Sequence, residues 1–130
     1  MARPVLVDSC WYITQAKKGQ DPLRALSLIA ESRDVAVCGM VKAEVGRGLR
    51  VSRHLEMYER AWSVMLYVDS NFKRWEETMR LAWHLDRQGI NLPIQDVHIA
   101  VCAAHIGAVI LTYDQHFKKI PGIDSTDQIY

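Results

Sequence analysis

The fold class of this chain is indicated by a short segment near its N-terminus, Val5-Leu6-Val7-Asp8-Ser9. Three consecutive apolar residues are typical of a strand that is buried on both faces, as in a parallel sheet. A carboxylate and a hydroxyl follow at the point where this strand ends. In open α/β sheets, sites form just outside the carboxyl ends of the strands. The segment therefore predicts both a buried strand and the position of a site.

The rest of the chain alternates between apolar runs and segments with helical spacing. Further strands are expected at 35–39, 66–68 and 109–112, with a weak final strand that includes Ile129. Helices are expected from the Asp21-Pro22 cap to Ser32, over 40–49, 54–65 and 95–106, and from the Asn71 cap to a stop at Gly89. This alternation predicts an α/β layered domain with a parallel sheet and right-handed crossovers.

The composition fits one soluble globular domain over residues 1–130, with 49% apolar and 24% charged residues. The apolar run at 5–7 is too brief for a signal-peptide core, and the longest run, 99–111, is too short for a membrane span. The three cysteines form no Cys-x-x-Cys pair and are interpreted as small buried hydrophobic residues: Cys10, Cys38 and Cys102. We therefore expect a cytoplasmic protein with reduced thiols.

Four carboxylates follow or interrupt the apolar runs: Asp8, Glu44, Asp96 and Asp114. Asp8 and Asp114 stand just past strand ends, which a parallel sheet brings to one edge. Glu44 comes about one helical turn after the second strand, and Asp96 begins the helix that leads to the next strand. Gathered carboxylates repel one another unless a cation binds them, and oxygen ligands favour Mg²⁺ or Mn²⁺. A divalent-metal site is predicted, although single aspartates at such places also serve as caps.

Hydroxyl and cationic side chains accompany these carboxylates. Ser9 and Thr112 can hold a water or a phosphate oxygen, or simply fix a strand end. The net charge is +1, but without the four carboxylates eleven acidic residues face sixteen basic ones. An acidic pocket in a basic surround suits a phosphodiester substrate. The cations expected to bind it, unless they are ordinary surface charges, are Arg47, Arg50, Lys118 and Lys119.

A second group with metal-ligand spacing lies on the helix expected at 95–106. His98, Cys102 and His105 are spaced i, i+4, i+7 and share one helical face, which suits a soft metal such as zinc. Only three ligands are visible, and the helix is apolar nearly all round. Cys102 is therefore interpreted as a core residue, and the two histidines as lining a groove or a partner surface.

The middle helices carry more large apolar side chains than one small sheet is expected to cover: Trp62, Met65, Trp75, Met79 and Trp83. Some of them should form an exposed patch. A two-fold homodimer would bury such a patch.

Four motifs in this order resemble the PIN-domain nucleases: Val5-Leu6-Val7-Asp8-Ser9, Ala43-Glu44, Leu92-Pro93-Ile94-Gln95-Asp96 and Leu111-Thr112-Tyr113-Asp114-Gln115-His116-Phe117. The length and the long middle helix are most similar to the VapC toxins of toxin–antitoxin pairs. The resemblance implies a three-layer α/β/α sandwich with a central, mainly parallel sheet, and a divalent-metal ribonuclease. It also implies a homodimer and an antitoxin whose tail occupies the active-site groove. By motif position, the acidic ligands are Asp8, Glu44, Asp96 and Asp114, with Ser9 and Thr112 nearby.

The chain departs from this family pattern at three places. Many relatives carry a serine or threonine near the end of the second strand, where this chain has Cys38-Gly39-Met40-Val41. Tyr113 replaces a small polar or basic residue, and His116 stands where an acidic residue often sits. These departures leave the four acidic residues intact.

From both lines of argument we expect a Mg²⁺- or Mn²⁺-dependent endoribonuclease that hydrolyses RNA with a metal-activated water. Glu44 is expected to be a further metal ligand or a base that orients the water. The alternative is a weakly active or inactive PIN-like binding module that acts through an antitoxin partner at operator DNA.

Overall fold

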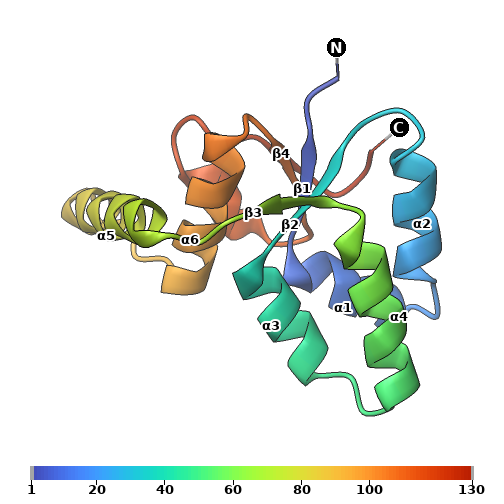
Figure 1. The fold of residues 1–130 in the computed structure, drawn as a ribbon. Coiled ribbons are helices and arrows are strands. Elements are labelled where there is room, and N and C mark those ends of the chain that lie inside the picture. The colour runs from blue at the N-terminus through green and yellow to red at the C-terminus, as the bar shows by residue number, and fades with distance from the viewer. Residues whose placement is uncertain (1, 130) are drawn as a thin grey trace.

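The computed structural model describes residues 2–129 and contains a central sheet with helices on both sides (Figure 1). Its strands are β1 (Val5–Val7), β2 (Val35–Cys38), β3 (Leu66–Val68), β4 (Val109–Leu111) and β5 (Ser125–Thr126). They lie in the order β3-β2-β1-β4-β5, and every neighbouring pair is parallel. All residues of β1 and β2 are buried, which confirms the prediction made from their continuous apolar runs.

Two helices follow each of the first three strands along the chain. They are α1 (Ser9–Lys17), α2 (Pro22–Ile29), α3 (Gly39–Arg47), α4 (Ser52–Ser63), α5 (Phe72–Arg87) and α6 (Ile94–His105), and a short 3-10 helix, η1 (Gln115–Lys119), follows β4. Figure 1 shows α5 and α6 on one side of the sheet and α2 and α4 on the other. This arrangement confirms the three-layer α/β/α sandwich.

Two helix starts confirm the caps expected from the sequence. The Asp21 carboxylate accepts hydrogen bonds from the main-chain N–H groups of Leu23 and Arg24, at 3.1 and 3.3 Å. The side-chain oxygen of Asn71 accepts one from the N–H of Arg74 at 3.0 Å. Each bond satisfies a donor that the first helical turn leaves without a partner, so local sequence fixes where α2 and α5 begin.

The strand order creates a switch point between β1 and β4. Val5 of β1 pairs with Val35 of β2 on one side and with Val109 of β4 on the other. The chain first builds outward from β1 through β2 to β3, and later returns to add β4 and β5 on the opposite side. Crossovers on the two sides of such a point diverge, which leaves a crevice at the carboxyl ends of the two strands.

Two expected features of the chain differ from the structure. The apolar spacing predicts no helix directly after β1, yet α1 begins at Ser9 and buries the adjacent residues Trp11 and Tyr12. Adjacent buried residues do not give the spacing of a one-sided amphipathic helix, so the period is weak. The expected final strand with Ile129 is wrong, since β5 contains only Ser125 and Thr126, and such a short polar strand has no apolar pattern.

Large aromatic side chains fill the space between α1 and α4. Trp62 is 3% exposed, and its indole N–H donates to the Tyr12 hydroxyl at 3.1 Å. Trp62 therefore belongs to the core and not to an exposed patch. Among residues 2–129, no helix is both long and apolar enough to cross a membrane.

Candidate active site

Asp8 lies at the carboxyl end of β1 and is only 2% exposed. Its carboxylate accepts a hydrogen bond from the Thr112 hydroxyl at 2.8 Å, and its main-chain N–H donates to the Leu111 carbonyl at 3.0 Å. Both partners belong to β4 or follow it directly, so the side chain is fixed across the switch point. Within residues 2–129, no cationic side chain forms an ion pair with this buried carboxylate.

The surroundings of Asp8 disfavour its negative charge. The pKa of Asp8 is raised to about 6, chiefly by burial and to a smaller extent by the nearby charges of Asp96, Glu44 and Asp114, while the Thr112 hydrogen bond partly opposes the rise. Like charges act in this way only when they lie close together. The four carboxylates predicted to converge therefore face one region of the molecule.

Glu44 reaches this region from the second turn of α3. It is half-buried, and its carboxylate accepts a hydrogen bond from the Ser9 hydroxyl at 3.1 Å. Ser9 is the first residue of α1, so this bond links the two helices that begin at the ends of β1 and β2. The hydroxyl holds one oxygen of Glu44 in place beside Asp8.

Asp96 and Asp114 approach each other from separate elements. Asp96 lies in the first turn of α6, and Asp114 precedes η1. His116 joins them, because its Nδ1 lies 2.8 Å from Asp96 Oδ2 and 3.2 Å from Asp114 Oδ1. Burial raises the pKa of Asp96, and the hydrogen bond with His116 partly opposes this effect. Within residues 2–129, these three form the one group of His, Cys, Asp or Glu side chains with possible metal-binding atoms all within 4.8 Å of one another.

Helix capping accounts for one of the three aspartates. Asp114 Oδ1 accepts the main-chain N–H of His116 at 2.8 Å, which is a cap of η1. Asp8 stands at the cap position of α1 but makes no side-chain cap bond. Asp96 lies inside its helix, whose cap residue is Pro93. Capping therefore leaves two buried or half-buried carboxylates without an explanation.

The donor set fits a hard divalent cation. It consists of carboxylate oxygens, most of them shielded from solvent, together with one imidazole nitrogen. A divalent cation would offset both the burial and the like-charge repulsion that raise the pKa of Asp8. Thr112 supports this set, since it donates to Asp8 and accepts the N–H of Asp114 at 2.9 Å.

The cations expected to bind phosphates lie in different surroundings. Lys118 borders a small polar hollow of about 120 Å³ together with Thr112 and Asp114, and its ammonium donates to the Ser125 carbonyl at 3.4 Å. It therefore lies at the rim of the carboxylate site. Arg47, Arg50 and Lys119 are exposed, and no ion pair within residues 2–129 joins them to the carboxylates.

Gln15 of α1 and Lys18, which directly follows this helix, reach the loop after β4 and were not expected there. Gln15 donates a hydrogen bond to the Tyr113 hydroxyl at 2.6 Å, and the Lys18 ammonium lies 4.6 Å from the centre of the Tyr113 ring. Lys18 is thereby a further cation that contacts Tyr113, the residue that precedes Asp114 in the chain. These contacts could have been expected only if a helix had been predicted directly after β1, and the apolar spacing does not indicate one.

The expected zinc alternative involves His98, Cys102 and His105. His98 is fully buried, with Nδ1 2.9 Å from the Thr78 hydroxyl and Nε2 2.8 Å from the Ser70 hydroxyl. His105 lies instead against the guanidinium of Arg74, at 2.6 and 2.7 Å. The two histidines are therefore held by partners on α5 and by Ser70, which lies just before it, and they link α5 to α6.

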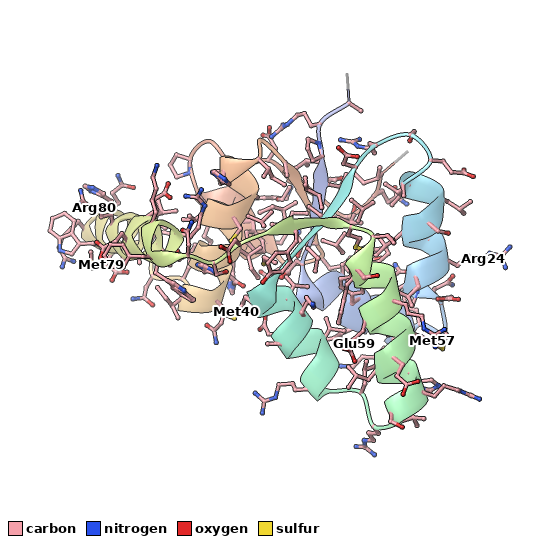
Figure 2. All side chains as sticks on the ribbon, viewed as in Figure 1. Arg24, Met40, Met57, Glu59, Met79 and Arg80 are labelled. Atoms are coloured by element: carbon pink, nitrogen blue, oxygen red, sulfur yellow. The ribbon has the colours of Figure 1, made fainter. Side chains whose placement is uncertain are left out.

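An exposed apolar stripe runs along α5. Its members are Phe72, Trp75, Met79 and Trp83, which are 79%, 44%, 56% and 53% exposed. Figure 2 shows Met79 on the outer side of α5, away from the sheet. The expected exposed patch is confirmed for these tryptophans and Met79, whereas Met65 packs against the core with Trp62.

Comparisons with known proteins bear on this arrangement. Residues 5–123 match the model of a protein family described as the PIN domain. A DNA-bound VapBC from Salmonella typhimurium has 23% identity and a TM-score of 0.78, covering 96% of this chain and 98% of that chain. VapBC2 from Rickettsia felis, bound to a DNA fragment from the promoter, has 20% identity and a TM-score of 0.77, covering 95% and 97%.

A third solved structure is Mycobacterium tuberculosis VapC20, described as a sarcin–ricin loop cleaving toxin. It has 15% identity and a TM-score of 0.61, covering 85% of this chain and 90% of that chain. No curated protein matches the sequence significantly. At these identities the structural likeness shows a shared fold.

Proposed function

The chain belongs to the PIN-domain family, and from this premise we propose that it is a divalent-metal-dependent endoribonuclease and the toxin of a toxin–antitoxin pair. The observation that carries the proposal is the buried Asp8 carboxylate, whose pKa is raised to about 6 by burial and by three neighbouring carboxylates. A protein gains nothing in stability from such an arrangement. Binding of a cation and a phosphodiester substrate would explain why the carboxylates are gathered there.

We assign the metal ligands as Asp8, Asp96 and Asp114, with Glu44 as a further ligand or a base, and Mg²⁺ or Mn²⁺ as the cation. When bound, such a cation lowers the pKa of a water molecule and polarises a phosphoryl oxygen. The Thr112 hydroxyl orients the Asp8 carboxylate at 2.8 Å. The Ser9 hydroxyl holds Glu44 Oε1 at 3.1 Å, and Oε2 would be the oxygen that accepts a proton from a water if Glu44 acts as a base.

Binding of RNA is assigned to the cations around the carboxylates. Lys118 at the rim of the site would meet a phosphate next to the scissile bond. The exposed residues Arg47, Arg50 and Lys119 would add contacts along the strand. The acidic centre repels a polyanion by itself, so we expect productive binding to require the divalent cation.

We also propose an antitoxin protein as partner and a cytoplasmic location. Several structural neighbours are VapBC complexes. An apolar hollow of about 400 Å³ lies directly beside Glu44, and its lining includes Tyr12, Ile13, Val45 and Leu49. Apolar side chains of an antitoxin tail placed there would bring the tail to the carboxylates. The three cysteines are free thiols, as a reducing compartment requires.

A homodimer is the proposed state of the free chain, and the stripe on α5 is its proposed interface. Four large apolar residues at helical spacing are exposed there. Symmetric burial of such a surface against a second copy removes it from water. Light scattering at tens of micromolar should give twice the mass of the chain, and a monomeric mass would contradict this assignment.

The nuclease proposal is tested with antitoxin-free protein, labelled single-stranded and structured RNA, and Mg²⁺, Mn²⁺ or chelator. We expect cleavage with either metal and none in chelator. Asp96→Asn and Asp114→Asn should each lower the rate by about 100-fold or more, since each removes a ligand charge. Glu59→Gln, at an exposed residue of α4 that is labelled in Figure 2, is the matched control and should cleave normally. Cleavage that persists in both asparagine variants, or RNA and DNA binding without cleavage, would contradict the proposal.

A further inference from the structure

We infer that His116 is a nitrogen ligand of the cation site and that it makes the site prefer Mn²⁺ to Mg²⁺. The inference rests on the proposed function, because it concerns the same site. It goes further in naming an additional ligand and the metal that this ligand selects.

The position of the imidazole is the first argument. Its Nδ1 lies 2.8 Å from Asp96 Oδ2 and 3.2 Å from Asp114 Oδ1. Neighbouring ligand atoms around an octahedral cation with bonds of roughly 2.1 Å are about 3 Å apart. The nitrogen therefore lies from each of the two oxygens at the spacing of neighbouring ligands on one cation, and all three atoms lie within 4.8 Å of one another.

The local fold is the second argument, since it holds the ring at this place. The main-chain N–H of His116 donates to Asp114 Oδ1 at 2.8 Å, which closes the first turn of η1. The next residue, Phe117, is fully buried and anchors that turn in the core. The side chain of His116 is 41% exposed, against 14% for Asp96 and 25% for Asp114, so it forms the solvent side of the group.

Ligand chemistry then decides which metal is favoured. Mg²⁺ binds oxygen ligands and keeps several waters, whereas imidazole suits transition metals. Mn²⁺ accepts both carboxylate oxygens and nitrogen in octahedral geometry. A site that contains three or four carboxylates and one imidazole should therefore bind Mn²⁺ more tightly than Mg²⁺.

A purely positioning role of His116 gives a different expectation. If Nδ1–H only donates a hydrogen bond to Asp96, removal of the ring would weaken Mn²⁺ and Mg²⁺ binding by the same factor. Loss of a residue that orients a metal ligand commonly costs roughly 10- to 100-fold in affinity, so affinity for one metal does not separate the two roles. The ratio of the two affinities and a direct signal from nitrogen do separate them.

The test uses the full chain loaded with Mn²⁺ and pulsed electron paramagnetic resonance at one fixed pH. We expect the modulation of a single coordinated imidazole nitrogen, which should vanish in His116→Ala. His54→Ala, an exposed histidine on α4, is the matched control and should keep the modulation. Calorimetric titrations with each metal should show an Mn²⁺ preference of at least about tenfold that falls in His116→Ala and His116→Asp.

The His116→Asp variant guards against a trivial loss of structure, since its carboxylate supplies an oxygen ligand in place of the imidazole and the variant should still bind Mg²⁺. Absence of nitrogen modulation in the wild type, or equal weakening of both metals in His116→Ala, would overturn the inference. If metal binding is nevertheless lost in Asp96→Asn, the proposed nuclease site stands without this ligand. If neither metal binds the wild-type chain at all, both the inference and the proposed function fail.

Discussion

Two parts of this molecule bury polar side chains, and they do so in opposite ways. Between α5 and α6, His98 is fully buried and both of its ring nitrogens are paired with hydroxyls. At the ends of β1 and β4, Asp8 is buried with one hydroxyl as donor and three carboxylates nearby. Paired polar groups stabilise a fold, whereas gathered like charges destabilise it. We therefore interpret the first region as structural and propose that the second binds a cation.

The bonds of His98 form a consistent network. The Thr78 hydroxyl donates to the carbonyl of Arg74 at 2.8 Å, so toward His98 it acts as the acceptor of Nδ1–H. Nε2 is then the acceptor of the Ser70 hydroxyl. Burial lowers the pKa of His98, and the ring of Trp75 is stacked on it at 3.8 Å. The network is therefore that of a neutral imidazole and needs no metal.

The largest expected effect is on this network. His98→Ala removes a buried ring, its hydrogen bonds with Ser70 and Thr78, and the 3.7 Å contact of its Nε2 with Cys102 Sγ. We expect it to lower the free energy of unfolding by about 3 kcal/mol. Urea denaturation measures the change, and His84→Ala on the exposed side of α5 should stay within about 0.5 kcal/mol of the wild type. A loss as small as that of the control would remove the structural assignment.

Substitution of Asp8 is expected to change the free energy of unfolding in the opposite direction, toward greater stability. Its folded-state pKa of about 6 lies above its ordinary value of 3.8, so the ionised group destabilises the fold. Below about pH 4 the carboxyl is protonated in both states, and this cost is absent; it develops as the pH rises to about 6 and stays constant above. In chelator at pH 7.5, Asp8→Asn should therefore raise the free energy of unfolding by about 2 to 3 kcal/mol.

The pH series and metal addition check this interpretation. The difference between Asp8→Asn and the wild type should shrink toward zero as the pH is lowered from about 6 to 4. Adding Mn²⁺ or Mg²⁺ at pH 7.5 should stabilise the wild type and so reduce the difference in free energy of unfolding between it and Asp8→Asn. A wild type that is more stable than Asp8→Asn in chelator at pH 7.5 would show that the charge is compensated within the protein.

The two regions also differ in how far the sequence predicts them. The apolar run of β1 and the caps of α2 and α5 carry local signals, and the structure confirms them. Convergence of the four carboxylates follows from parallel topology, since strand ends meet at one edge. The neutral His98 network depends on Ser70 and Thr78, whose hydroxyls carry no signal of their own in the sequence.

Contacts made by an unexpected helix or across a long sequence separation could not be predicted. α1 has a weak apolar period, so the approach of Gln15 and Lys18 to Tyr113 was hidden. His116 and Asp96 are 20 residues apart and lie on different elements. Only the packing of η1 against α6 brings them together, and no spacing rule covers such a pair.

A smaller effect is expected for the cation at the rim of the carboxylate site. Lys118→Ala should weaken RNA binding in the presence of the divalent cation, and its salt dependence should fall by about one unit of slope. The fold and the metal affinity should not change, because Lys118 is exposed and makes only one bond, to the Ser125 carbonyl, among residues 2–129. Binding isotherms at several salt concentrations measure the slope, and an unchanged slope would remove Lys118 from the RNA-binding surface.

The smallest effect is expected from removal of metal ions at the α5–α6 region, where a chelator should leave the stability unchanged. Both nitrogens of His98 lie at hydrogen-bond distance from hydroxyls, Cys102 Sγ lies 3.7 Å from His98 Nε2, and both ring nitrogens of His105 lie against Arg74, so we expect no zinc ion among these side chains. Purified protein should contain no stoichiometric zinc by elemental analysis, and a chelator should not lower the stability of Asp8→Asn. Stoichiometric zinc that disappears in the His98→Ala and His105→Ala proteins would reverse the comparison, because the structural region would then be the one that holds a metal.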